Sequence, residues 1–202
     1  MPDIVPRRPT CDRCALPLRT CVCALATSAR NEVDVLVLQH PDEAREAKNS
    51  ARLLRLSLAR CRVVVGDVFD PQALLALLDG DVSGSALLYP RDTQLEGAAP
   101  VPAVPPRRLV LLDGTWRRSA QMLRANALLQ SLPRWALQPA GPARYRALRK
   151  AARSTQLSTL EAACAALADI ESAPARYEPL LAAFDRFVAD GALRAGRNAS
   201  AQ

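Results

Sequence analysis

The residues best placed to do chemistry lie in the run 109–116, where an apolar, strand-like stretch ends at a carboxylate. Asp113 closes the apolar stretch, and Gly114 and Thr115 then lead into a helical pattern. The surrounding charge is one-sided: residues 107–153 hold eleven basic residues and a single acid, Asp113, and carry +10, whereas the whole chain carries +7. A lone carboxylate ringed by arginines predicts an active-site group beside a bound polyanion.

The same residues allow structural interpretations. Asp113 could equally be the N-cap of the helix that follows, with Thr115 sharing that role. Trp116 is by default a core residue of that helix, with stacking on a nucleobase as the alternative. A coding bias towards arginine would explain why the chain has only two lysines, but not why acids are missing from 107–153. The missing acids therefore favour catalysis and nucleic-acid contact.

Two further candidates for the site lie outside this run. His40, the single histidine, follows an apolar stretch and precedes Pro41. It is either a satisfied structural residue or part of the cleft. The basic segment 144–153 is either a solvated helix face or a clamp on a nucleic-acid backbone, and we favour the clamp.

Four of the six cysteines fall within thirteen positions, at Cys11, Cys14, Cys21 and Cys23. Paired thiolates on tight turns provide the tetrahedral sulfur ligands that a structural Zn²⁺ requires. The alternatives are two disulfides, which a reducing compartment disfavours, or a redox pair, which would not need the second pair of thiols. We expect zinc there, and we expect Cys61 and Cys164 to be buried and inert.

The elements that must position these residues alternate between strands and helices. Apolar periodicity predicts strands at 33–38, 62–65, 85–89, 109–112 and 134–137, and helices at 42–59, 71–78, 115–126, 157–170 and 180–193. Asp42 is expected to cap the first helix, and Pro71 to open the second. The alternation predicts an α/β fold with a mostly parallel sheet and helices on both faces. Ligands of such sheets bind beyond the carboxyl ends of the strands, where His40 and Asp113 lie.

Length and composition limit the other possibilities. A chain of 202 residues, half of them hydrophobic, suits one domain with a small appendage; we place a zinc-binding head at 1–30 and a catalytic domain at 31–202. We find no apolar run of membrane-spanning length and no signal peptide, so we expect a cytoplasmic protein without a membrane partner. Neither dinucleotide-binding nor phosphate-loop glycine motifs occur.

Taken together, several motifs resemble the DTW-domain family, in particular its bacterial tRNA-uridine aminocarboxypropyltransferases. In chain order they are the four-cysteine head, His40-Pro41-x-Glu43, Lys48-Asn49-Ser50, Arg52-Leu53, Leu88-Tyr89-Pro90, Asp113-x-Thr115-Trp116, Tyr145-x-x-Leu148-Arg149 and Leu157-Ser158-Thr159-Leu160-Glu161-Ala162. The resemblance covers nearly the whole chain. Ser50 departs from the more usual threonine but keeps the hydroxyl group.

The resemblance implies a SPOUT-like fold with a trefoil knot on its C-terminal side, which sequence patterns alone would not suggest. It implies S-adenosylmethionine as donor and tRNA as partner. Members of this family transfer the 3-amino-3-carboxypropyl group to N3 of a uridine, in the variable loop for the bacterial enzymes, and release methylthioadenosine. Some SPOUT proteins are dimers, but we expect a monomer here.

The chemistry suits particular residues of this chain. Attack on a carbon beside a sulfonium needs alignment and removal of the N3 proton, and Asp113 is our candidate for the base or the orienting group. Strand-end loops would hold the donor, through Leu88, Tyr89, Pro90, Leu112, Gly114, Thr115, Leu157, Ser158 and Thr159. The tRNA contacts would come from His40, Lys48, Asn49, Trp116, Arg117, Arg118, Arg144, Tyr145, Arg149 and Lys150.

Three other functions remain compatible with the sequence. A SPOUT methyltransferase would use the same donor but transfer the methyl group. A non-catalytic RNA-binding protein with a zinc head would bind tRNA without binding the donor. A thiol oxidoreductase would need an accessible pair of reactive thiols at Cys11 and Cys14, which a tightly held metal would exclude.

Overall fold

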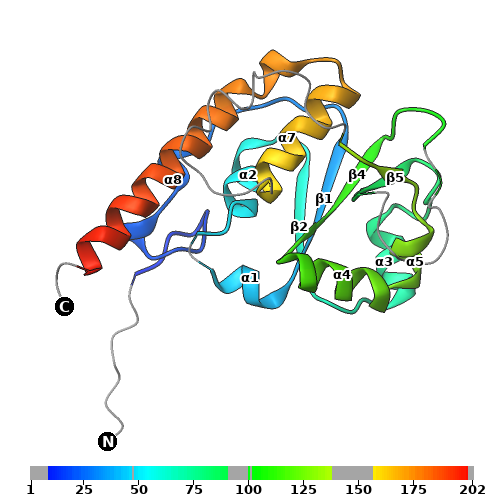
Figure 1. Ribbon diagram of the computed structural model, residues 1–202, viewed down its shortest axis with the longest axis horizontal. Coiled ribbons are helices and arrows are strands. Elements are labelled where there is room, and N and C mark those ends of the chain that lie inside the picture. Colours follow the sequence, from blue (N-terminus) through cyan, green and yellow to red (C-terminus); the bar gives the residue numbers. More distant parts are fainter. Residues whose placement is uncertain (1–8, 47, 91–99, 101, 138–156, 200–202) are drawn as a thin grey trace, which may run out of the picture.

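A five-stranded sheet is the centre of the molecule (Figure 1). The computed structural model describes residues 9–46, 48–90, 100, 102–137 and 157–199, the last eight of them as backbone only. The strands are β1 (Asp34–Gln39), β2 (Cys61–Val65), β3 (Ser85–Leu88), β4 (Arg108–Asp113) and β5 (Arg134–Trp135). Their order is β2-β1-β4-β3-β5, and every neighbouring pair is parallel, which confirms the predicted parallel α/β sheet.

Helices cover both faces of this sheet, as predicted (Figure 1). Alternate residues of β1 enter two separate cores: Val35 and Val37 face one side, Leu36 and Leu38 the other. The first core is completed by α2 (Ala51–Ser57), α7 (Thr159–Ile170) and α8 (Glu178–Ala199), and the second by α3 (Pro71–Leu77), α4 (Trp116–Ala125) and α5 (Ala127–Ser131). The short helix α1 (Pro41–Arg45) follows the carboxyl end of β1.

Local capping chemistry fixes where the helices begin. Asp70 accepts a hydrogen bond from Ala73 N at 2.9 Å, and Pro71 opens α3 as predicted. Helix α7 begins with a capping box, in which Ser158 Oγ accepts from Glu161 N and Glu161 Oε2 accepts from Ser158 N at 2.8 Å. The expected cap at Asp42 is wrong: its own N–H donates to His40 Nδ1, because the helix starts one residue earlier.

The single helix predicted at 42–59 is in fact two. Helix α1 ends at Arg45, and α2 starts only at Ala51. Apolar periodicity runs through both helices, but Asn49 and Ser50 in between are buried and face other elements. Asn49 Oδ1 accepts from Ala51 N at 3.0 Å while its amide reaches β4, and a continuous helix would point that side chain elsewhere. Helix α5, which we did not predict, follows a similar break at Asn126.

The cysteine-rich segment folds onto helices α2 and α8. Cys11 N donates to Leu16 O at 2.7 Å, and Ala15 adopts a left-handed conformation with φ of 56° to close that turn. Two 3-10 helices follow, η1 (Leu18–Thr20) and η2 (Cys23–Leu25); a third, η3 (Pro174–Arg176), joins α7 to α8. Buried residues of the segment pack on Leu56 of α2 and Phe187 of α8. The boundary near residue 30 stays a prediction.

The described residues do not include the segment on which the expected knot depends. The knot expected on the C-terminal side depends on 138–156, which lie outside the described residues. The chain leaves β5 at one edge of the sheet and returns as α7 against β4. In the described part of the chain, no helix combines the length and apolar character needed to span a bilayer.

Candidate active site at the carboxyl ends of β1 and β4

Asp113 is the last residue of β4 and is buried, with 4% of its surface exposed. Its register partner is Gln39, the last residue of β1. Directly paired residues point to the same face of a sheet, so the register brings the two polar ends together. Gln39 Nε2 donates to Asp113 Oδ2 at 2.7 Å.

Two other segments donate to the same carboxylate. Asn49 Nδ2, from the break between α1 and α2, donates to Asp113 Oδ2 at 2.7 Å. Thr159 Oγ1, from the first turn of α7, donates to Asp113 Oδ1 at 2.5 Å. Gln39 Nε2 also donates to Asn49 Oδ1 at 2.9 Å, which ties the two amides together. Within the described residues, the hydrogen-bond donors to this carboxylate are thus neutral, and together they satisfy a charge that burial would otherwise penalise.

Thr115, not Asp113, caps α4. Its Oγ1 accepts a hydrogen bond from Arg118 N at 3.4 Å, and its backbone has the extended conformation of an N-cap residue. The N-cap interpretation of Asp113 is therefore wrong, and its carboxylate serves the buried network instead.

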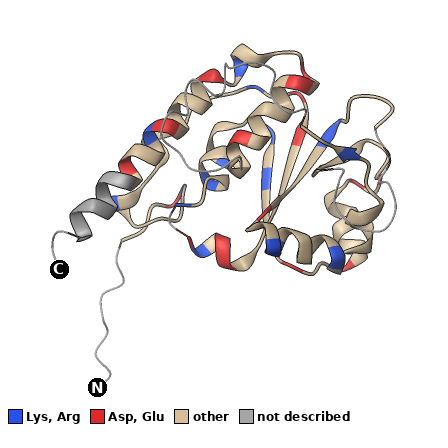
Figure 2. Ribbon diagram, in the orientation of Figure 1, with Lys and Arg blue, Asp and Glu red and all other residues tan. Residues whose placement is uncertain are grey.

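The predicted ring of arginines around Asp113 is also wrong for the residues that the structure describes. Arg107 and Arg108 lie at the other end of β4, where Arg108 pairs with Asp34 and Asp79. Arg118 pairs with Asp42 and Glu43 of α1, with its closest contact at 2.6 Å to Asp42. Arg134 is buried, and its guanidinium donates to the carbonyls of 129, 130 and 132. Sequence proximity misled us because Arg108 and Arg118 pair with acids of other elements, and Arg134 with backbone carbonyls. Figure 2 marks the acidic and basic positions on the ribbon.

A cavity of about 350 Å³ opens beside this network, within the usual size range of small-molecule sites. Of the nine residues predicted to hold the donor, all but Ser158 line it; Ser158 caps α7 instead. Asp113 does not line the cavity, whereas Thr159 does. The full lining is Leu88, Tyr89, Pro90, Leu111, Leu112, Gly114, Thr115, Trp116, Ser119, Ala136, Leu137, Leu157, Thr159 and Ala162.

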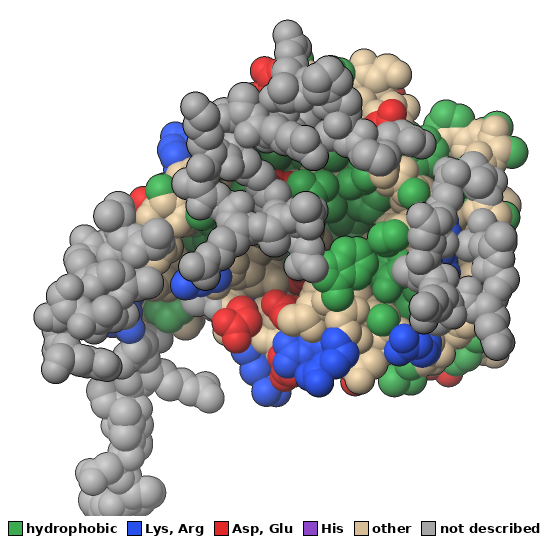
Figure 3. Space-filling model, in the orientation of Figure 1, with side chains coloured by type: hydrophobic (Ala, Val, Ile, Leu, Met, Phe, Trp, Pro, Cys, Tyr) green, Lys and Arg blue, Asp and Glu red, His purple; other side chains and the backbone are tan. Residues whose placement is uncertain are grey.

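An aromatic pair forms part of the cavity wall. Trp116 is 49% exposed, so the default core interpretation of this residue is wrong. Its ring meets Tyr89 edge to face, with centroids 6.0 Å apart, and the Arg134 guanidinium lies 5.9 Å from the centre of the Tyr89 ring. Burial raises the pKa of Tyr89 above its usual value, so its hydroxyl stays protonated. Figure 3 shows apolar side chains in the middle of this face and basic side chains below them.

The residues predicted to bind tRNA fall into three groups. Lys48 and Arg117 are exposed, and Trp116 lies at the cavity. Arg118 is engaged with acids, His40 is partly buried as the cap of α1, and Asn49 is 8% exposed and faces Asp113. The remaining four, Arg144, Tyr145, Arg149 and Lys150, lie outside the described residues.

Sequence reasoning missed Gln39 as a site residue. It is 6% exposed and contacts both Asp113 and Asn49. One signal was available: Gln39 is the polar residue that ends an apolar strand, as Asp113 does for β4. Its role became visible only with the register that pairs the two strand ends.

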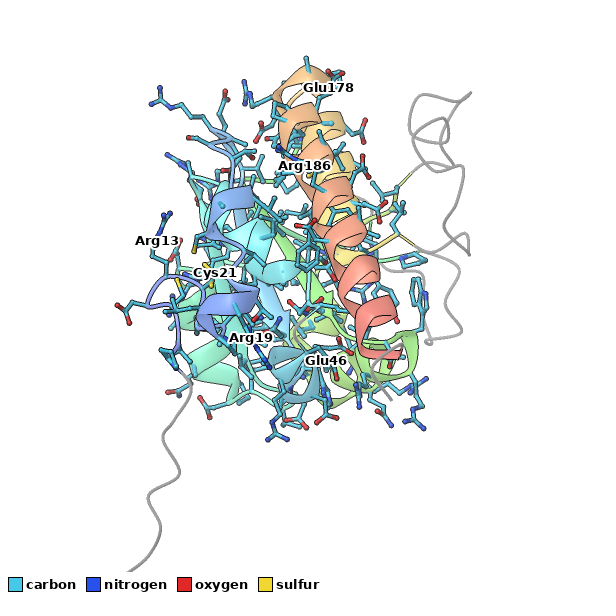
Figure 4. The ribbon with its side chains drawn as sticks, turned by 90° about the vertical axis from the view of Figure 1, so that its left-hand side faces the viewer. Arg13, Arg19, Cys21, Glu46, Glu178 and Arg186 are labelled. Carbon is cyan, nitrogen blue, oxygen red and sulfur yellow. The ribbon has the colours of Figure 1, made fainter. Side chains whose placement is uncertain are left out.

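The four cysteines of the head form a candidate metal centre. Their Sγ atoms all lie within 4.8 Å of one another, and the pairs Cys11–Cys23 and Cys14–Cys21 are each separated by 3.7 Å. Four thiolates at about 2.3 Å from a tetrahedral zinc ion would be roughly 3.8 Å apart. No disulfide joins them, so the donor set fits the predicted zinc site. Figure 4 shows Cys21 within the head, with the side chains of Arg13 and Arg19 beside it.

Thiol environments differ between the head and the rest of the chain. Hydrogen bonds from the backbone of Cys14 and Arg13 lower the pKa of Cys11 to about 6, whereas burial and the neighbouring thiols raise the pKa of Cys23 to about 12. Burial is the main cause that raises the pKa of both Cys61 and Cys164 to about 12. Cys164 is buried as expected, whereas Cys61 is only partly buried, and the raised pKa keeps both thiols protonated near neutral pH.

Comparison with known proteins places these features in a family. The DTW domain model matches residues 8–191. This chain is 31% identical to tRNA-uridine aminocarboxypropyltransferase 2 of Mus musculus over 183 residues. The match covers 87% of this chain and 61% of that protein. The Drosophila melanogaster protein of the same name is 30% identical, with coverage of 87% and 72%. The Arabidopsis thaliana tRNA-uridine aminocarboxypropyltransferase A is 27% identical, with coverage of 61% and 53%. No solved structure matches the chain.

Proposed function

Because this chain belongs to the DTW domain family, we propose that it transfers the 3-amino-3-carboxypropyl group of S-adenosylmethionine to N3 of a uridine in tRNA. The by-product is methylthioadenosine. The chain spans 61% of the length of the mouse relative, which is named as a tRNA-uridine aminocarboxypropyltransferase. The target is a uridine of the variable loop, which is the assignment that the motif resemblance implies.

One observation carries this proposal. Three motifs that are far apart in the sequence contribute to one cavity at the carboxyl ends of parallel strands: Leu88-Tyr89-Pro90, Thr115-Trp116, and Leu157 with Thr159. Asp113 lies behind the wall and accepts a hydrogen bond from Thr159. Parallel α/β sheets bind their ligands at that edge. The mainly apolar wall suits an adenosyl group, and Trp116 offers an exposed aromatic face to a base.

The reaction needs alignment and a proton acceptor. The cavity wall holds the donor so that N3, the γ carbon and the sulfur are in line. This alignment lowers the activation barrier of the transfer. Because the leaving sulfur is already cationic, no electrophilic group is required to assist it. Asp113 takes up the N3 proton, and Gln39 and Asn49 hold its carboxylate in one orientation.

The tRNA lies over the cavity in this proposal. Among the residues predicted to bind tRNA, Lys48 and Arg117 are exposed cations in the described part of the chain. Further contacts come from the predicted residues outside the described part, which are Arg144, Tyr145, Arg149 and Lys150. Phosphate contacts of this kind position the RNA without reading its sequence. His40 and Arg118 lie at α1, where His40 caps the helix and Arg118 ties α4 to it.

Further parts of the proposal concern the whole chain. Cys11, Cys14, Cys21 and Cys23 hold a structural Zn²⁺ that stabilises the head against α2 and α8. The SPOUT-like knot on the C-terminal side that the resemblance implies is part of the same proposal. The protein acts in the cytoplasm as a monomer.

Nucleoside mass spectrometry of unmodified tRNA incubated with the protein and S-adenosylmethionine tests the function. We expect aminocarboxypropyluridine together with methylthioadenosine. Asp113→Asn keeps the shape of the side chain but removes its basicity, so we expect transfer to fall by about 100-fold or more while calorimetry shows retained donor binding. Full activity of this variant would exclude Asp113 as the base.

The same experiment separates the competing functions. A methylated uridine with S-adenosylhomocysteine as by-product would identify a methyltransferase. Salt-sensitive tRNA binding without any donor binding would identify an RNA-binding protein that does no chemistry.

A further inference from the structure

We propose that the hydroxyl group of Thr159, rather than the carboxylate of Asp113, contacts the uridine N3 and relays its proton to Asp113. This inference rests on the proposed function and adds a residue to its mechanism. It assigns Thr159 a catalytic role in place of the donor contact that the motif resemblance implied.

Thr159 has access to the cavity, whereas Asp113 does not. Asp113 is 4% exposed and is absent from the cavity wall, so a substrate base in the cavity has no direct path to its oxygens. Thr159 is half-buried and lines the cavity. Its Oγ1 lies 2.5 Å from Asp113 Oδ1, so one hydroxyl group links the cavity to the carboxylate.

The two oxygens of Asp113 differ in the hydrogen bonds that they accept. Asp113 Oδ2 already accepts from both Gln39 Nε2 and Asn49 Nδ2, each at 2.7 Å. The two amides leave Oδ1 as the oxygen free to gain a proton, and Thr159 Oγ1 donates to that oxygen. A threonine hydroxyl donates one hydrogen bond and accepts others, so Thr159 can accept from N3–H while it donates to Asp113.

The fold holds Thr159 in this place for reasons independent of the reaction. It is the first residue of α7, and the capping box between Ser158 and Glu161 fixes that turn. Next to it, Leu160 N donates to Ser50 Oγ at 3.4 Å, which ties the turn to the segment that carries Asn49. The relay therefore has a fixed geometry before any substrate arrives.

Proton transfer and bond formation occur together in the proposed step. N3–H gives its proton to Thr159 Oγ1 as the hydroxyl proton of Thr159 passes to Asp113 Oδ1. The N3 electron pair forms a bond to the γ carbon of the methionine moiety, and the bond from that carbon to sulfur breaks. The bonding pair stays on sulfur, which changes from a sulfonium to the neutral thioether of methylthioadenosine, while Asp113 becomes a neutral acid.

The test compares three variants by transfer rate, pH profile and donor affinity. Thr159→Val replaces the hydroxyl with a methyl group of similar size, and we expect transfer at neutral pH to fall by about 100-fold or more. Thr159→Ser keeps the hydroxyl and should stay within about tenfold of the wild type. Thr27→Val is the matched control, because Thr27 Oγ1 is buried without a hydrogen-bond partner in the described part of the chain. It should retain wild-type activity.

The pH profile distinguishes a relay from a merely structural role. The rate of Thr159→Val should rise with alkaline pH, because N3 then ionises without help, whereas a misfolded site would not recover. Calorimetry should show donor affinity within a few-fold of the wild type. If Thr159→Val unfolds, the smaller Thr159→Ala supplies the same measurements without added bulk.

The outcomes separate the two proposals. Near wild-type transfer by Thr159→Val, beside an inactive Asp113→Asn, would overturn the relay and leave the proposed function in place. Equal inactivity of Thr159→Val and Thr159→Ser, with no alkaline recovery, would also overturn the relay. Absence of the modified nucleoside with the wild-type protein would overturn the proposed function and the relay with it.

Discussion

At the scale of single residues, the site is a buried carboxylate stabilised by neutral groups. Asp113 accepts hydrogen bonds from Gln39, Asn49 and Thr159 and forms no ion pair with an arginine of the described residues. The buried carboxylate therefore has its hydrogen bonds satisfied by amide and hydroxyl groups, which also fix its orientation. The finding therefore changes the expected electrostatics of the site: the arginines serve binding or structure, and the amides and hydroxyl serve the carboxylate.

Trp116 provides the residue-scale prediction. It is 49% exposed, so Trp116→Ala should change the free energy of unfolding by less than about 0.5 kcal/mol. Loss of a stacking face for a base should weaken tRNA binding by about 1–3 kcal/mol, or roughly 5- to 150-fold. Filter binding and thermal unfolding measure the two effects. Unchanged tRNA affinity would show that the exposed ring does not stack on the substrate.

At the scale of secondary-structure elements, the beginnings and breaks of helices aim the functional side chains. The break between α1 and α2 directs Asn49 towards β4, and the capping box of α7 sets Thr159 beside the cavity. Both devices are local, yet each gains its function only from a strand end that lies elsewhere in the sequence. The site is therefore sensitive to small changes in helix starts that leave the fold intact.

Two helix caps form a matched pair that tests this sensitivity. Ser158→Ala and Asp70→Ala each remove an N-cap side chain, of α7 and α3 respectively. Each should lower the free energy of unfolding by about 1 kcal/mol, or the midpoint of thermal unfolding by about 2–4 °C. Ser158→Ala alone should also lower transfer activity, because α7 carries Thr159. Equal effects of the two variants on activity would contradict the role of the α7 start.

At the scale of the whole molecule, charge is distributed differently from its distribution along the sequence. The segment 107–153 is strongly basic, but Arg107 and Arg108 lie at the end of the sheet opposite the cavity and pair with acids there. Arg117 follows a cavity residue at the start of α4 and is exposed. Figure 2 shows basic and acidic positions interspersed over the described helices. Within the described residues, the basic surface available to RNA is thus smaller than the sequence suggested.

A second matched pair tests where tRNA lies. Arg117→Ala and Arg107→Ala remove the same charge from opposite ends of the sheet. Arg117→Ala should weaken tRNA binding and reduce the slope of log affinity against log salt concentration by about 0.7–0.9, because one phosphate contact is lost. Arg107→Ala should leave both unchanged. Equal effects would indicate a purely non-specific attraction by net charge.

The cysteine head yields a prediction about the stability of the molecule. The purified protein should contain one zinc ion, and a strong chelator should lower its thermal unfolding midpoint, because the head packs on α2 and α8. Cys14→Ser should abolish metal binding, since Cys14 contributes one of the four ligands and is buried. Cys61→Ser, outside the head, is the control and should keep the metal. A metal-free protein of unchanged stability would exclude a structural zinc site.

What the sequence determined by itself was local. Apolar periodicity and the spacing of the cysteines predicted the alternating elements and the cysteine cluster, because these depend on neighbours within a few positions. The family motifs supplied eight of the residues that line the cavity. The tertiary structure decided which distant groups meet. Register paired Gln39 with Asp113, a broken helix turned Asn49 inward, and acids of other elements neutralised Arg108 and Arg118. Burial and ion pairing depend on three-dimensional neighbours, which the order of residues along the chain does not reveal.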